Sequence, residues 1–233
     1  MSLLPDGIVA CLFDLDGVLT ETAKVHAAAW KQTFDDELAK REGPSFTPFD
    51  AHDDYDRYVD GKPRYDGVRS FMTSRGYDLG KEELHRIGDR KNELVVRLIH
   101  EQGVDAFPGS VRFLRAVADA GLHRAVVSSS ANCRDVLRAA GIEDMFETRV
   151  DGVTIQSEQL AGKPAPDSYL AAARKLGVEP GQAAVFEDAL SGVEAGRAGR
   201  FGYVVGVNRA DQADALRELG ADIVVDDLAD LLQ

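Results

Sequence analysis

The chain has 233 residues, of which 44% are hydrophobic and 29% are charged, and its formal net charge at pH 7 is −13. This length allows one large domain or a core with a smaller insert, and the composition is ordinary for a globular protein. The acidic balance argues against binding to nucleic acids, which requires basic patches, although a local cluster of cations could still bind a small anion.

The N-terminal residues 1–13 lack the basic start of a signal peptide, and no apolar run is long enough to span a membrane. The two cysteines, Cys11 and Cys133, lie far apart in the sequence and favour free thiols in a reducing compartment. We therefore expect a cytoplasmic protein that does not contact a membrane.

The first predicted element is a strand over residues 7–13, whose apolar run lacks alternation and therefore indicates burial on both faces. Helical patterns follow at residues 22–42, 68–76 and 81–103, with an aromatic and charged stretch between the first two. Because no strand pattern is evident here, we expect residues 22–100 to form a small helical domain inserted after the first strand.

From residue 108 onward the pattern alternates between helix and strand. Helices are predicted at 108–121, with Ser110 as a possible N-cap, and at 131–141, 166–177 and 213–219. Strands are predicted at 123–129, 183–188, 203–207 and 222–225. The predicted fold class is α/β, a Rossmann-like parallel-sheet core with helices on both faces. The core would comprise residues 1–21 and 101–233.

Polar side chains follow the predicted strands. They are Asp14 and Asp16, then Ser128, Ser129 and Ser130, then Glu187 and Asp188, and Lys163 lies in a loop before a helix. Each pattern alone has an ordinary explanation, such as a solvated turn, a loop lysine or a helix N-cap. Because the carboxyl ends of parallel strands meet at one edge of a sheet, we expect these residues to lie together.

A group of buried carboxylates needs a positive partner, because like charges repel and burial penalises each of them. Magnesium prefers oxygen ligands and would offset this repulsion. With Lys163 as a second positive charge and Ser128 as a hydroxyl donor, the set suits phosphoryl transfer. One aspartate could then be the nucleophile that carries an aspartyl phosphate, and the other could be the general acid and base.

Four motifs resemble the haloacid dehalogenase superfamily and occur in its order. They are FDLDGV at 13–18, VVSSS at 126–130, GKPAPD at 162–167 and FEDALSG at 186–192. The resemblance implies that Asp14 is the nucleophile and Asp16 the general acid and base, and that Ser128 and Lys163 bind the transferring phosphoryl group. It also identifies the helical insert at 22–100 as a cap domain.

The same resemblance implies a Mg²⁺ cofactor. Its ligands would be Asp14, the backbone carbonyl of Asp16, and Asp188, with Glu187 close by as a ligand or as a group in the outer shell.

Residues 14–31 are similar to the β-phosphoglucomutase-like subfamily of that superfamily. This similarity implies that Thr22 and His26 lie near the acid/base. It implies a substrate-binding set formed by His26, Trp30, Gly61, Lys62, Arg64 and Lys91 from the cap, and by Ser129, Ser130 and Asn132 from the core. Within this set, Arg64 would grip the phosphate that is not transferred, because its guanidinium can bond two phosphate oxygens.

Ordinary alternatives remain for the cap residues: Trp30 in the cap core, Arg64 in a surface ion pair, and Lys91 on a solvated helix face. Ala131 stands where mutases of this subfamily have a lysine, so the phosphate grip would be weaker or rebuilt, for instance by Lys62.

The implied function is a Mg²⁺-dependent sugar-phosphate mutase that interconverts β-glucose 1-phosphate and glucose 6-phosphate. One alternative is a phosphatase of a small sugar phosphate, in which water completes the same reaction. A third possibility is a non-enzymatic sensor of a phosphorylated ligand. The expected partner is a small phosphorylated sugar, with no nucleic acid and no membrane, and the chain is expected to be a monomer.

Overall fold

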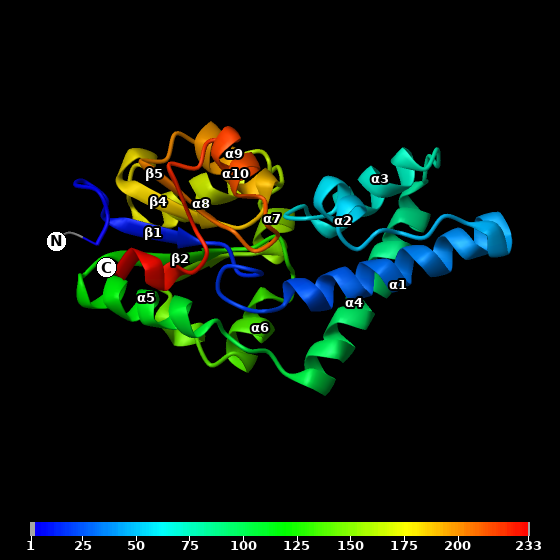
Figure 1. Ribbon diagram of the computed structural model, residues 1–233, viewed down its shortest axis with the longest axis horizontal. Coiled ribbons are helices and arrows are strands. Elements are labelled where there is room, and N and C mark those ends of the chain that lie inside the picture. Colours follow the sequence, from blue (N-terminus) through cyan, green and yellow to red (C-terminus); the bar gives the residue numbers. More distant parts are fainter. Residues whose placement is uncertain (1–2, 233) are drawn as a thin grey trace.

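A computed structural model describes residues 3–232 (Figure 1). Within this range a parallel sheet has the strand order β3-β2-β1-β4-β5-β6. The strands are β1 (Ala10–Phe13), β2 (His123–Val127), β3 (Thr148–Val150), β4 (Ala183–Glu187), β5 (Tyr203–Val207) and β6 (Ile223–Val225). The order reverses direction beside β1, and ligand sites of open parallel sheets lie at such a point.

Helices cover both faces of the sheet. They are α5 (Pro108–Asp119), α6 (Cys133–Ala139), α7 (Gly152–Ser157), α8 (Asp167–Leu176), α9 (Leu190–Ala198) and α10 (Ala213–Glu218). Side chains of α5 and α6 join one buried apolar cluster, and side chains of α7, α8, α9 and α10 join another. Short 3-10 turns complete the chain at Gly43–Ser45, Glu143–Met145, Pro180–Gln182 and Leu228–Leu232. The α/β prediction with helices on both faces is confirmed.

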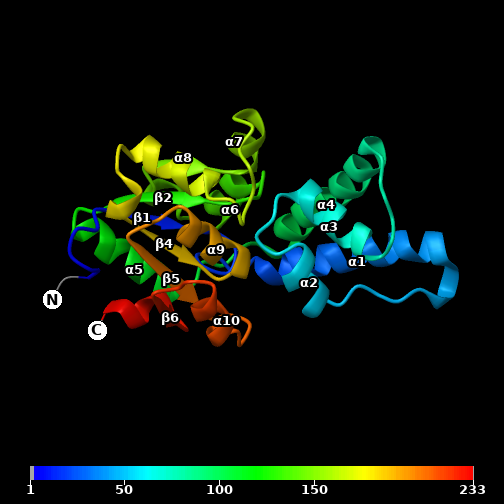
Figure 2. The same ribbon diagram turned by 90° about the horizontal axis from the view of Figure 1, so that it is seen from above.

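The remaining helices lie beyond the carboxyl end of β1, as Figures 1 and 2 both show. They are α1 (Ala23–Glu42), α2 (Asp53–Tyr58), α3 (Arg64–Ser74) and α4 (Lys81–Gln102). They enclose an apolar cluster of their own, in which Phe34 contacts Trp30, Phe49 and Phe71. This separate cluster supports the predicted division into a core and a cap at 22–100, which we retain as a proposal.

The aromatic stretch at 43–60 has a structural role in this cluster. Phe49 is 1% exposed and packs edge-on against Phe71, while Val59 is also buried. The segment between α1 and α3 therefore completes the apolar interior of the cap, because it contributes Phe49 and Val59 to the buried cluster.

Several details differ from the sequence expectations. The short helices α2 and α7 were not predicted, and α3 begins at Arg64 and not at residue 68. Helix α5 begins at Pro108, so Ser110 is not its N-cap; the Ser110 hydroxyl is buried and donates to Val18 O at 2.6 Å. Proline is favoured at the first helical position, and it sets the start of the helix two residues earlier. Strand β3 was not predicted, because its three residues carry no periodic pattern.

Cys11 and Cys133 are both buried and both free. None of the helices in the described part of the chain is long and apolar enough to cross a membrane.

Candidate active site

Three strands end at the same level and bring polar side chains to one edge of the sheet. Phe13 of β1 lies opposite both Val126 of β2 and Phe186 of β4. The residues that follow in each strand therefore come together, namely Asp14, Ser128, Glu187 and Asp188.

A buried lysine joins two of these carboxylates. Lys163 is 3% exposed, and its Nζ donates to Asp14 Oδ1 at 2.5 Å and also to Glu187 Oε1. Burial lowers the pKa of Lys163, but the neighbouring Asp14 and Glu187 outweigh burial and raise it well above its usual value. The ammonium is therefore charged, and it holds Asp14 in a fixed orientation.

Glu187 is positioned from several sides. Tyr169 Oη donates to Glu187 Oε1 at 2.9 Å, and the backbone N–H of Ala189 donates to Glu187 Oε2 at 3.0 Å. A Cβ at Gly192 would lie only 1.8 Å from Glu187 Oε1, so the helix α9 approaches the carboxylate closely. Both oxygens of Glu187 have protein partners, and this arrangement favours a role in holding Lys163.

The acids form a cluster that fits a cation. Oxygen atoms of Asp14, Glu187 and Asp188 all lie within 4.8 Å of one another. Burial, and then neighbouring acids, raise the pKa of Asp188 well above its usual value, and burial raises the pKa of Asp14 in the same direction. A divalent cation would reverse both effects, and an all-oxygen donor set suits Mg²⁺. The carboxylate of Asp16 lies outside this cluster, so its backbone carbonyl remains the predicted ligand.

Gly17 brings the loop after β1 directly against this cluster. Its φ is +86°, and a Cβ at this position would lie 1.7 Å from Asp188 Oδ2. Both the backbone conformation and the missing side chain are therefore required here.

The second aspartate is held from the cap side. Thr22 Oγ1 donates to Asp16 Oδ1, and His26 Nε2 lies 3.8 Å from the same oxygen. Lys91 Nζ lies 3.1 Å from His26 Nδ1 and 4.6 Å from the centre of the Trp30 ring. The structure thus brings these predicted residues together around Asp16, and Trp30, at 3% exposed, also belongs to the cap core.

Burial lowers the pKa of His26 to about 4, and Lys91 adds to this effect. His26 is therefore neutral at pH 7. If Lys91 donates to Nδ1, then Nε2 carries the ring hydrogen and can donate toward Asp16. Burial also lowers the pKa of Lys91 to about 7.

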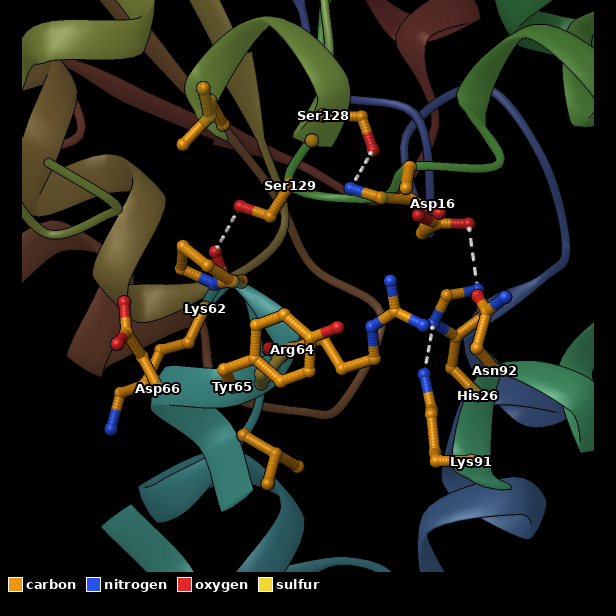
Figure 3. A pocket seen from close by; sticks show the side chains of 18 of the residues that line it. Asp16, His26, Lys62, Arg64, Tyr65, Asp66, Lys91, Asn92, Ser128 and Ser129 are labelled. Atoms are coloured by element: carbon orange, nitrogen blue, oxygen red, sulfur yellow. Dashed lines mark hydrogen bonds and ion pairs between the residues drawn. The ribbon is translucent and has the colours of Figure 1, made fainter. Parts of the chain in front are cut away.

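A pocket of about 480 Å³ lies between the cap and the core (Figure 3). Its lining includes most of the predicted site residues: Asp14, Asp16, His26, Trp30, Gly61, Lys62, Arg64, Lys91, Ser128, Ser129, Ser130, Asn132 and Asp188. Lys163 and Glu187 are absent from this lining because they lie beneath Asp14. In Figure 3 the Arg64 side chain points toward the side of the pocket that holds His26 and Asn92.

Lys62 lines the pocket, but its ammonium is directed elsewhere. It donates to Arg57 O at 3.1 Å and to Ser70 Oγ at 3.2 Å, and Figure 3 shows it pointing away from Arg64. To replace the lysine that is missing at Ala131, Lys62 would have to break its hydrogen bonds to Arg57 O and Ser70 Oγ. Arg64 lies 3.7 Å from Asp89, so the ion pair considered from the sequence is present beside the pocket.

The cap loop at 60–63 is seated on the core. Ser129 Oγ donates to Gly61 O at 2.7 Å, and Ser191 Oγ donates to Asp60 O at 3.1 Å. Gly61 has a φ of +68°, and a Cβ there would lie 2.4 Å from Ser191 Oγ. Ser129 therefore contacts the cap backbone, and the described conformation of the cap is closed over the pocket.

Several pocket residues were not anticipated. Asn92 Oδ1 accepts from Asn132 Nδ2 at 2.8 Å and so links cap to core across the pocket. Asp60 also lines the pocket, and burial, followed by the charge of Glu187, raises its pKa to about 7. The only sequence signal for them was position, since Asn92 follows Lys91 and Asp60 precedes Gly61.

Comparison with known proteins agrees with this geometry. Residues 8–200 match the family of haloacid dehalogenase-like hydrolases. The chain therefore belongs to this family, and the family prediction from the four motifs is confirmed.

The β-phosphoglucomutase of Mycobacterium bovis is 55% identical over 98% of this chain and 93% of its own length. Among solved structures, a hydrolase from Pseudomonas syringae has a TM-score of 0.80 with 26% identity over 96% of both chains. The β-phosphoglucomutase of Clostridium difficile has a TM-score of 0.78 with 28% identity, over 96% of this chain and 93% of that one. The predicted subfamily is therefore also confirmed.

Proposed function

We propose that this protein is a Mg²⁺-dependent sugar-phosphate mutase that interconverts β-glucose 1-phosphate and glucose 6-phosphate through an aspartyl phosphate. The observation that carries the proposal is the pairing of Asp14, held by Lys163, with Asp16, which Thr22 holds and His26 Nε2 approaches to 3.8 Å, in one pocket closed by the cap. The 55% identity to a β-phosphoglucomutase supports the sugar and the reaction.

In the first half-reaction, a carboxylate oxygen of Asp14 attacks phosphorus of glucose 1,6-bisphosphate, and the bond from phosphorus to the sugar oxygen breaks. The carboxyl of Asp16 donates its proton to that leaving oxygen. In the second half-reaction, the 6-hydroxyl oxygen of β-glucose 1-phosphate attacks phosphorus, Asp16 takes the hydroxyl proton, and the bond between phosphorus and Asp14 breaks. The glucose 1,6-bisphosphate formed in this way turns round in the pocket, so that Asp14 next attacks its 1-phosphate and glucose 6-phosphate is released.

Other residues stabilise charge on the transferring group. Lys163 Nζ, 2.5 Å from Asp14 Oδ1, would neutralise phosphoryl oxygens, and the Ser128 hydroxyl would donate to one of them. Mg²⁺ held by Asp14, the Asp16 carbonyl and Asp188 would supply further positive charge and orient the phosphate. Arg64 and Asn132 would hold the second phosphate on the opposite side of the pocket.

The closed cap serves the mutase in particular. An aspartyl phosphate is hydrolysed if water reaches it. The hydrogen bonds from Ser129 Oγ to Gly61 O and from Ser191 Oγ to Asp60 O hold the cap over the pocket. The cap side chains of His26 and Lys91 would then adjust Asp16 only when the cap is closed, because both approach it from the cap helices.

Phosphatase activity is the second candidate. Ala131 leaves the phosphate grip without a lysine, and Lys62 is bonded within the cap. A weaker grip would favour release of the sugar before it turns, and water would then attack the aspartyl phosphate. The match to a family of hydrolases also supports this alternative.

The test is an assay with Mg²⁺, β-glucose 1-phosphate and a trace of glucose 1,6-bisphosphate, in which glucose 6-phosphate and free phosphate are measured separately. The mutase proposal predicts that glucose 6-phosphate is the main product. Dominant release of free phosphate would establish the phosphatase instead. Binding of the sugar phosphate without either product would favour the sensor considered from the sequence.

A further inference from the structure

The connection between core and cap consists of two antiparallel segments, residues 17–22 leaving the core and residues 103–107 returning to it. Glu21 N donates to Asp105 O at 3.0 Å, and Phe107 N donates to Leu19 O at 2.9 Å. An isolated antiparallel bridge pairs Thr20 with Ala106. Movement of the cap relative to the core must bend this paired hinge, because both covalent links run through it.

Arg209, in the loop after β5, touches both segments of the hinge. Its Nε donates to Gly17 O at 2.8 Å, and its guanidinium lies 3.8 Å from the centre of the Phe107 ring. A third contact, from Nη1 to Asp226 O at 2.9 Å, anchors the side chain beyond β6. One planar group thus joins the outgoing segment, the returning segment and the C-terminal part of the core.

The loop that carries Arg209 is itself fixed. Gln212 N donates to Asn208 Oδ1 at 2.9 Å, and Asn208 Nδ2 donates to Asp226 Oδ1 at 2.9 Å. Gln212 Nε2 also donates to Asp188 O at 3.0 Å. The loop at 208–212 therefore reaches the acid cluster through Asp188 as well as the hinge through Gly17.

One nitrogen of the Arg209 guanidinium makes no hydrogen bond within the described residues. This nitrogen, Nη2, is buried. A buried donor without an acceptor costs stability. The placement of Arg209 is therefore better explained by what its other atoms hold than by a gain in stability at this position.

The clamped carbonyl belongs to the residue next to Asp16. Gly17 is trapped between Arg209, which holds its oxygen, and Asp188, whose carboxylate occupies the space of a side chain. Since Gly17 N also donates to Thr20 O at 2.9 Å, the loop has little freedom once its carbonyl is held. The contacts of Gly17 with Arg209 and Asp188, which we call the clamp, then set the position of Asp16 relative to Asp14.

We propose that Arg209 is a positioning residue for phosphoryl transfer, which clamps the hinge between core and cap and so holds Asp16 over Asp14 in the closed conformation. This inference rests on the proposed phosphoryl-transfer function. It does not depend on whether a sugar hydroxyl or water is the final acceptor.

The test compares Arg209→Met and Arg209→Lys with wild type, and with Arg197→Met as a matched control. Arg197 is a half-exposed arginine of α9 that pairs with Asp222 at the surface, away from the hinge. For each protein, hydrogen exchange of the Glu21 and Phe107 amides is measured without substrate, and kcat, KM and the ratio of free phosphate to glucose 6-phosphate are measured with Mg²⁺.

For Arg209→Met we expect both hinge amides to exchange about tenfold faster, with no change for the β4 amides. We expect kcat to fall about tenfold or more while KM changes less than about threefold, and the share of free phosphate to rise. Arg209→Lys should recover part of kcat, because it keeps the charge and one donor, and Arg197→Met should resemble wild type.

Unchanged exchange at Glu21 and Phe107 in Arg209→Met would overturn the clamp, whatever the activity. Equally faster exchange in β4 would also overturn it, because it would show a purely structural role. If wild type itself turns over no sugar phosphate, the proposed function fails, while the exchange measurement still decides whether Arg209 holds the hinge.

Discussion

At the centre of the site, the ammonium of Lys163 forms ion pairs with two buried carboxylates. Lys163 contacts both Asp14 and Glu187, and all three side chains are at most 11% exposed. Acids this deep depend on the lysine or on a cation for compensation, because their own desolvation opposes the charged form.

Replacing this lysine tests that dependence. We expect Lys163→Met to abolish activity and to lower the free energy of unfolding, without Mg²⁺, by about 3 kcal/mol, because Asp14 and Glu187 lose their shared partner. Added Mg²⁺ should recover more stability in the variant than in wild type. Urea denaturation with and without Mg²⁺ checks this, and equal stability of variant and wild type without metal would contradict it.

Lys91 offers a test by pH. Burial lowers its pKa from 10.5 to about 7. Between these two values the unfolded chain binds the proton that the folded chain has lost, so this group makes stability rise with pH from about 7 toward 10.5.

Lys91→Met should remove this rise. We expect wild type to gain about 2 kcal/mol more than the variant in its free energy of unfolding between pH 7 and pH 9, as measured by urea denaturation. Lys175→Met, which removes an exposed lysine paired with Glu158, serves as the control and should follow wild type. If the free energy of unfolding depends on pH in the same way in wild type and in Lys91→Met, burial does not lower the pKa of Lys91.

At the scale of elements, the loop after β1 is the tightest part of the site. Gly17→Ala places a methyl group 1.7 Å from Asp188 Oδ2, whereas Gly7→Ala, at a similar φ of +91°, meets nothing within 4 Å. Both substitutions carry the backbone strain of positive φ, about 1–2 kcal/mol, and Gly17→Ala alone must also displace Asp188.

We therefore expect Gly17→Ala to weaken Mg²⁺ binding by at least about tenfold, measured by calorimetry, and to lose most activity. Gly7→Ala should lose stability only. Unaltered Mg²⁺ affinity in Gly17→Ala would mean that Asp188 is not a ligand or that the loop can move aside.

The elements that the sequence predicted well are those with local signals. Helix α8 was expected from Pro166 to Gly177, and it runs from Asp167 to Leu176 with Gly177 in the left-handed conformation. The acids at the strand ends were also predictable, because parallel strands share one carboxyl edge.

The contacts that escaped prediction join distant parts of the chain. Ser110 was expected to cap its own helix, yet its hydroxyl bonds Val18, which is 92 residues away in the sequence. Arg209 reaches Gly17 across 192 positions, and Asn92 meets Asn132 across 40. Composition and periodicity describe one segment at a time, so partners of this kind become visible only when the segments are folded together.

At the scale of the whole molecule, a chain of net charge −13 must admit an anionic sugar phosphate. On the cap side of the pocket, Arg64 and Lys81 offset the global charge locally. The cap therefore provides both the cover and the positive charge, and its seat on the core should decide how much of the phosphoryl group reaches a sugar rather than water.

That seat can be disturbed at Gly61. A methyl group there would lie 2.4 Å from Ser191 Oγ, while Gly76→Ala, at a φ of +83° within the cap, meets nothing within 4 Å. We expect Gly61→Ala to raise the ratio of free phosphate to glucose 6-phosphate about tenfold, since a loosely seated cap admits water, and Gly76→Ala to leave it unchanged. If this ratio is unchanged in Gly61→Ala, closure of the cap does not decide whether the phosphoryl group goes to the sugar or to water.

The most direct test of the whole account asks where phosphorus is held. The protein is mixed with Mg²⁺ and glucose 1,6-bisphosphate, quenched in acid within one turnover, digested and analysed by mass spectrometry. The account predicts one phosphoryl group on the peptide that contains Asp14, released by hydroxylamine and missing in Asp14→Asn. A protein that turns over the sugar phosphate with no label, or with the label on another residue, would contradict it.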